Sequence, residues 1–118
     1  MFLRKARVII ILHITKREQW EKAKLEGVYQ GDKLDSHGFI RCSTSKQIVE
    51  VANDLFYAQK ELVLLYIATT KVQSEIRYES AEGEELYPHI YGPLNVDAVI
   101  KVAHFEPAEN GRFTLPKE

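Results

Sequence analysis

The stretch Val8-Ile9-Ile10-Ile11-Leu12-His13-Ile14 decides the fold, because six of its seven residues are aliphatic and His13 is the exception. An apolar run of this length predicts a strand that is buried on both faces. Directly after it, Thr15 and Glu18 have the spacing of a helix capping box, and Gly27 is suited to end the helix. We therefore expect a buried strand followed by a short helix.

After this first strand and helix, the rest of the chain is predicted to contain a loop, a second helix and further strands. Residues 28–36 are polar and contain glycine, so they are predicted to form a loop. A second helix is expected from Ser43 or Thr44, with Gln47 completing another capping box. Its apolar residues recur at helical spacing. Further strands are predicted at residues 38–42, 62–68, 76–79 and 96–105.

The segment Pro88-His89-Ile90-Tyr91-Gly92-Pro93-Leu94 is predicted to be a rigid loop rather than a strand. Its two prolines lack a backbone donor and fix φ, and Gly92 allows a turn or a close approach to a ligand. The loop also carries an imidazole and a phenol, which can exchange protons or orient a substrate. His89, Tyr91 and Gly92 are therefore candidate site residues.

These elements predict an α+β protein with a single compact domain, in which two helices pack on one strongly bent mixed β-sheet. The expected domain covers residues 1–118, with a core from about residue 7 to residue 105. Residues 106–118 are expected to form a polar, poorly ordered tail. A chain of 118 residues with 45% apolar content is too short for two domains but can bury a real core.

Composition also limits the partners and the compartment. The net charge of −1 argues against a protein that mainly binds nucleic acid, and no stretch is long enough to span a membrane. Cys42 is the only cysteine, so no disulfide can form within the chain, which suits a reducing cytoplasm. The sequence leaves the oligomeric state open.

Two other strands offer candidate site residues. His13 lies where the first strand gives way to a helix, a position where α/β proteins place functional groups. A His bonded to a backbone carbonyl is an equally good interpretation. Glu79 ends a short strand. On one interpretation it accepts a proton or binds a ribose hydroxyl, and on the other it forms a surface ion pair with Arg77.

The segment Gly38-Phe39-Ile40-Arg41-Cys42-Ser43 is the third candidate region. Arg41 can bind a phosphate or carboxylate through its fork of donors, and helix-start amides near Ser43 would assist it. The plainer interpretation of Ser43 is a helix cap. Four histidines are present, but no His-x-x-x-His or Glu-x-x-His spacing occurs, so no metal site is predicted.

Taken in order, several of these motifs resemble one family. They are His13-Ile14-Thr15 with Trp20, Gly27-Val28-Tyr29, Gly38 to Ser43, Tyr78-Glu79 and the segment Pro88 to Leu94. The chain resembles the small, mostly bacterial family called domain of unknown function nine-five-two, from about Ile11 to Phe105. Relatives usually have His where this chain has Arg41, and Arg cannot act as a general base near neutral pH.

The family is in turn remotely similar to the ADP-ribosyltransferase fold, which includes the tRNA 2′-phosphotransferases. This resemblance implies a cleft for NAD, with His13 contacting a ribose and Glu79 orienting the acceptor. NAD would be a substrate, and no cofactor is otherwise implied.

Three functional hypotheses follow. The first is a transferase-like enzyme that uses NAD, ADP-ribose or another nucleotide. Its catalytic residues would be His13, Glu79, His89 and Tyr91, and its ligand-binding residues Thr15, Arg41, Ser43 and Gly92. The second is a non-catalytic module that binds a nucleotide or other anionic metabolite in the same cleft. The third is a protein-interaction domain that docks through the proline segment.

Overall fold

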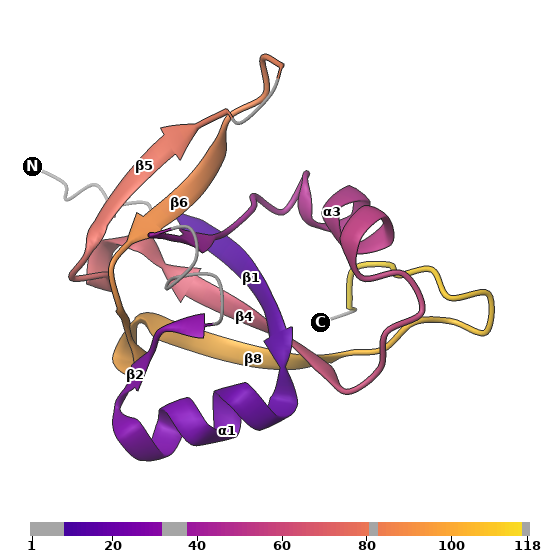
Figure 1. Ribbon diagram of the computed structural model, residues 1–118, viewed down its shortest axis with the longest axis horizontal. Helices are drawn as coiled ribbons and strands as arrows, with labels where there is room; N and C mark the ends of the chain where they lie inside the picture. Colours follow the sequence, from indigo (N-terminus) through magenta and orange to yellow (C-terminus); the bar gives the residue numbers. More distant parts are fainter. Residues whose placement is uncertain (1–8, 32–37, 81–82, 117–118) are drawn as a thin grey trace, which may run out of the picture.

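Two apolar runs pair at the centre of the fold. In the computed structural model, which describes residues 9–31, 38–80 and 83–116, β1 (Ile10–Lys16) lies antiparallel to β4 (Leu62–Ala68). The third strand of this sheet, β8 (Val99–Phe105), pairs with the other edge of β4 (Figure 1). The strand predicted at residues 62–68 is confirmed at both ends. The predicted start of the first strand, Val8, lies outside the described residues.

Both faces of this central sheet are covered, which explains why β1 and β4 are continuous apolar runs. On one face, Ile11 and Leu65 pack with Trp20 of α1 (Arg17–Glu26). On the other face, Leu12 and Leu64 pack with α3 (Ile48–Leu55). The alternation of side chains along each strand therefore supplies two separate apolar clusters.

A second sheet of three short strands carries the segment predicted to be a loop. The strands β3 (Ile40–Arg41) and β5 (Glu75–Glu79) flank β6 (Tyr87–Tyr91), so the loop prediction is wrong for residues 88–91. The carbonyl of Pro88 accepts the Cys42 N–H at 2.9 Å. In a strand the nitrogen points to the same side as the carbonyl, so the missing donor of Pro88 faces the end of β3. The backbone hydrogen bonds between β6 and β5 are therefore not interrupted by Pro88.

A backbone bridge joins the two sheets. An isolated antiparallel bridge pairs Leu12 of β1 with Ser43, through N–H···O bonds of 2.7 and 2.8 Å in the two directions. A two-stranded sheet pairs β2 (Val28–Tyr29) with β7 (Leu94–Asn95), and β2 packs beside α1. The loop predicted at residues 28–36 is therefore wrong for residues 28–29. The bridge fixes β3 next to the edge strand β1.

The helix ends agree only partly with the sequence. Gly27 ends α1 in the left-handed conformation, with φ 82°, as predicted. The capping box of Thr15 and Glu18 is wrong, because Thr15 still belongs to β1 and Lys16 is the residue before the helix. At α3 the Thr44 N–H donates to Gln47 Oε1 at 3.0 Å, which is half of the predicted capping box.

The C-terminal third also departs from the expectation. The strand predicted at residues 96–105 begins instead with a 3₁₀ turn at Val96–Ala98, and only Val99–Phe105 is strand β8. Another 3₁₀ turn, Thr69–Lys71, follows β4. Residues expected to form a loose tail instead contribute Phe113, which is buried and stacks on Phe105 with ring centroids 4.8 Å apart. Asn53 of α3 holds this segment, because its side-chain Oδ1 accepts the Phe113 N–H at 2.7 Å.

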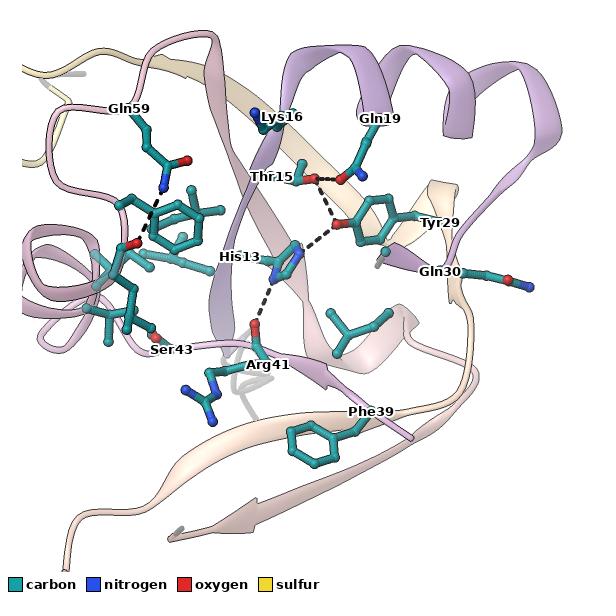
Figure 2. A pocket seen from close by; sticks show the side chains of 18 residues that line it. His13, Thr15, Lys16, Gln19, Tyr29, Gln30, Phe39, Arg41, Ser43 and Gln59 are labelled. Carbon is teal, nitrogen blue, oxygen red and sulfur yellow. Dashed lines mark hydrogen bonds between the residues drawn. The ribbon is translucent and has the colours of Figure 1, made fainter. Parts of the chain in front are cut away.

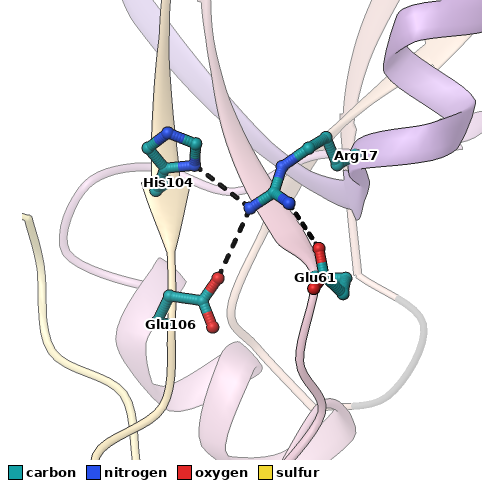
Figure 3. A network of polar contacts seen from close by, with 4 residues as sticks. All are labelled: Arg17, Glu61, His104 and Glu106. Atoms are coloured by element: carbon teal, nitrogen blue, oxygen red, sulfur yellow. Dashed lines mark hydrogen bonds and ion pairs between the residues drawn. The ribbon is translucent and has the colours of Figure 1, made fainter.

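A polar network ties three elements at one end of the central sheet. The Arg17 guanidinium at the start of α1 donates to Glu61, just before β4, and lies 3.5 Å from Glu106, just after β8 (Figure 3). Its Nη2 also lies 3.2 Å from His104 Nδ1. Its Nε is the one buried side-chain nitrogen or oxygen without a hydrogen bond in the described part of the chain.

The predicted α+β class is supported, with the helices α1 and α3 and antiparallel sheets in the described part of the chain. The expected single mixed sheet is different: all strand pairs between described residues are antiparallel, and they form three small sheets. No helix among these residues is long and apolar enough to cross a membrane.

Candidate functional site

A pocket of about 390 Å³ opens along the edge strand β1, between α1, β3 and α3 (Figure 2). This volume is within the range of pockets that hold small ligands. One wall is apolar and comes mainly from α3 and the residues after it. The opposite side is polar, and its members include His13 and Thr15 from β1, Gln19 from α1, Tyr29 from β2 and Arg41 from β3.

Hydrogen bonds link the polar side of the pocket into a chain. His13 Nδ1 lies 2.7 Å from the carbonyl oxygen of Arg41, and His13 Nε2 lies 2.8 Å from the Tyr29 hydroxyl (Figure 2). The Tyr29 and Thr15 hydroxyl oxygens are 2.8 Å apart, and Thr15 Oγ1 is 3.0 Å from Gln19 Oε1. Both ring nitrogens of His13 therefore have protein partners.

The surroundings of His13 favour its neutral form. Burial lowers the pKa of His13 from 6.5 to about 4, although the hydrogen bond to the Arg41 carbonyl acts in the opposite direction. A carbonyl oxygen only accepts, so the neutral ring carries its proton on Nδ1. The bond from His13 Nδ1 to the Arg41 carbonyl agrees with the second of the two equal sequence interpretations, a His bonded to a backbone carbonyl.

Arg41 reaches the pocket from β3, and Ser43 reaches it from the segment that follows β3. The Arg41 side chain is exposed at the pocket and forms no ion pair with any residue in the described ranges. The backbone N–H of Ser43 is bonded to Leu12, so the predicted helix-start amide at Ser43 is not available to an anion. The helix cap interpretation also fails, because α3 begins at Ile48.

The other predicted residues form a second group on the β3–β6–β5 sheet. Tyr91 donates its hydroxyl proton to Glu79 Oε1 at 2.5 Å, and His89 Nδ1 lies 3.0 Å from the same oxygen. These bonds lower the pKa of the Glu79 carboxyl, the Tyr91 bond most, and the bond to Glu79 raises the pKa of Tyr91. Arg77 lies over the Tyr91 ring at 4.2 Å and donates to Glu75.

The predicted residues are thus divided between two neighbouring groups. His13, Thr15, Arg41 and Ser43 line the pocket, whereas Glu79, His89 and Tyr91 do not. Phe39 connects the groups, because it lines the pocket and stacks on His89 with ring centroids 4.1 Å apart. Gly92 belongs to neither: its φ is 138°, and an added Cβ would lie 2.7 Å from Ser74 Oγ.

Sequence reasoning missed Tyr29, Gln19 and Phe39 as site residues. Tyr29 falls within the segment 28–36 that the sequence predicts to be a loop, but it is buried and bonded to His13. A lone large aromatic in a polar segment is the signal that marks it, since such residues are seldom left in solvent. Among the described residues, no group of three or more His, Cys, Asp or Glu side chains could hold a metal ion.

Comparison with known proteins places the chain in a family. Crystal structures of protein CC0527 from Caulobacter crescentus and of its double mutant each match at a TM-score of 0.82 and 29% identity, over 89% of this chain and 93% of theirs. The solution NMR structure of CC0527 matches at a TM-score of 0.77 and 30% identity, over 87% of this chain and 90% of the CC0527 chain. No curated protein matches the sequence. The model of the family described as protein of unknown function DUF952 matches residues 14–102, and this chain belongs to that family.

Proposed function

We propose that the pocket along β1 binds a small anionic ligand of the nucleotide class, with an apolar or aromatic part. The observation that carries this proposal is the charge of the lining. It contains two cations, Lys16 and Arg41, and no acidic residue among the described positions. The Arg41 fork suits a phosphate or carboxylate, and a positive pocket wall attracts anions.

The apolar wall supplies the other half of the recognition. Ile48, Val51, Leu55 and Phe56 line the pocket from α3 and the residue that follows it, and Phe39 lines it from the start of β3. Apolar side chains bind an aromatic base better than a bare phosphate, because burying a ring removes apolar surface from water. A nucleotide has both a ring and an anionic group, so it matches both walls.

Binding measured by calorimetry tests this proposal. AMP, ADP-ribose and NAD should bind, and adenosine should bind more weakly because it has no charge for Arg41. Arg41→Ala should raise the Kd of AMP about tenfold or more, since hydrogen bonds to charged groups contribute about 1.5–3 kcal/mol. It should leave the affinity for adenosine unchanged.

The matched control is Arg112→Ala, which removes an exposed arginine that does not line the pocket. This variant should bind AMP like the native protein. Equal loss of AMP binding in both variants would show that Arg41 acts only through net charge. No binding of any of these nucleotides to the native protein would refute the proposal.

A second candidate function is turnover of NAD by a transferase-like enzyme of the bacterial cytoplasm. It is supported by the Glu79, His89 and Tyr91 group, which lies next to the pocket through Phe39. The resemblance to the ADP-ribosyltransferase fold makes NAD the first substrate to test. Release of nicotinamide, followed by chromatography, should occur with the native protein and fail with Glu79→Gln. Binding of NAD without release would favour the binding module instead.

The interaction-domain hypothesis has less support. It required an exposed proline loop, whereas Pro88, His89 and Ile90 are buried within β6. A docking surface needs side chains that a partner can reach.

A further inference from the structure

His89 has the geometry of a histidine whose tautomer is set by a carboxylate. Its Nδ1 lies 3.0 Å from Glu79 Oε1, and a carboxylate with a lowered pKa is ionised and only accepts. The neutral ring must therefore carry its proton on Nδ1. Tyr91 donates to the same oxygen, which holds the carboxylate in place.

The other ring nitrogen is left available. Nε2 of His89 makes no hydrogen bond with any residue in the described ranges, although the whole side chain is only 5% exposed. Among the described residues, Arg17 Nε is the only fully buried side-chain nitrogen or oxygen that has no hydrogen bond. Nε2 of His89 also has no hydrogen bond with a described residue, so it is not fully buried. Nε2 therefore keeps contact with solvent, and its lone pair can accept a proton.

The contrast with His13 is informative. His13 uses both ring nitrogens within the protein, so a ligand reaches neither without breaking a bond. His89 uses one nitrogen and leaves one accessible. Sequence reasoning gave both residues catalytic roles, but this difference assigns proton transfer to His89.

The charges around His89 connect it with the pocket. In the strand register, His89 pairs with Arg41 of β3 on one side and with Arg77 of β5 on the other. Cross-strand partners on one face are near neighbours, with Cβ atoms about 5 Å apart. Arg77 is already engaged by Glu75 and Tyr91, so Arg41 is the cation left to hold a ligand beside His89.

We propose that His89 is the proton-transferring residue of this protein, that Glu79 is its positioning residue, and that Arg41 brings the anionic group of a pocket-bound ligand to it. The role of Arg41 rests on the proposed function, whereas the chemistry of His89 does not. A water or hydroxyl bonded to Nε2 gives its proton to that nitrogen while its oxygen forms a bond to the ligand atom that carries the leaving group. The bond between that atom and the leaving group breaks, and the leaving group departs with the electron pair. The imidazolium then returns the proton to the leaving group.

Nitrogen NMR of the imidazole rings tests the tautomer without a known substrate. At about pH 8, above the usual pKa of histidine, the native protein should show His89 with a protonated Nδ1 and an unprotonated Nε2. Glu79→Gln should give a mixture of tautomers, because an amide can either donate or accept. The matched control is Glu75→Gln, which removes the neighbouring carboxylate that bonds Arg77 and should leave the His89 signals unchanged.

Reactivity with diethyl pyrocarbonate, mapped by mass spectrometry, tests the accessibility of Nε2. His89 should be modified several-fold faster than His13, and Glu79→Gln should slow the modification of His89 several-fold. A proton on Nε2 in the native protein, or a His89 that reacts no faster than His13, would overturn the assignment.

Adding AMP separates this inference from the proposed function. Protection of His89 by AMP, lost in Arg41→Ala, supports both. Rapid modification of His89 with no AMP binding refutes the proposed ligand and the role of Arg41, and supports the His89 assignment alone.

Discussion

At the scale of single residues, the position of a histidine in the sequence said little about its chemistry. His13 and His89 both lie in strands beside apolar neighbours. What distinguishes them is the partner of each ring nitrogen: a carbonyl and a phenol for His13, and a carboxylate for His89. These partners come from residues 10 to 28 positions away, so no local pattern contains them.

The environment of His13 predicts a pH-dependent stability. Its pKa is lowered to about 4 in the folded protein and is near 6.5 when unfolded, so between these values only the unfolded chain binds a proton. The free energy of unfolding should therefore fall as the pH drops from 6.5 to 4, by up to about 3 kcal/mol, and not further below 4.

Urea unfolding of His13→Asn across this pH range checks the prediction. The variant should lack this part of the pH dependence, because asparagine does not titrate there. The control is His104→Gln, which replaces an exposed histidine and should keep the pH dependence of the native protein. An unchanged pH dependence in His13→Asn would show that other groups cause it.

At the scale of elements, two local rules gave opposite results. The left-handed glycine at the end of α1 was predicted correctly because φ above zero is a property of one residue. The proline rule failed at β6 because its effect depends on which neighbour the missing donor faces. That neighbour, the end of β3, is brought there by tertiary structure.

The Arg17 network gives a prediction at this scale. Arg17→Met should lower the free energy of unfolding by less than about 1 kcal/mol, because ion pairs with solvent-exposed partners contribute little. Glu61 and Glu106 are both substantially exposed, and methionine retains the apolar stem while removing the unpartnered Nε. Denaturant unfolding at low and high salt measures it. A loss of several kcal/mol would mean that the network is a main tie between the three elements.

At the scale of the whole molecule, the C-terminal segment completes the core. Phe113 packs with Phe105 and Leu64 on the α3 face of the central sheet, so Phe113→Ala should destabilise the protein by about 3–5 kcal/mol. Leu115→Ala, at a half-exposed leucine in the same segment, should cost much less. Thermal and denaturant unfolding compare the two. Equal effects would contradict the packing role of Phe113.

The sequence by itself determined the two central strands, the glycine that ends α1 and the α+β class. These follow from burial and periodicity, which are written in short stretches of chain. Only the tertiary structure decided that the candidate residues form two groups, with His13 held by Tyr29 and His89 by Glu79. It also decided that the proline segment is a strand and that Phe113 is core. The physical reason is that hydrogen bonds and packing join residues far apart in the chain, and their distances are set only when the sheets assemble.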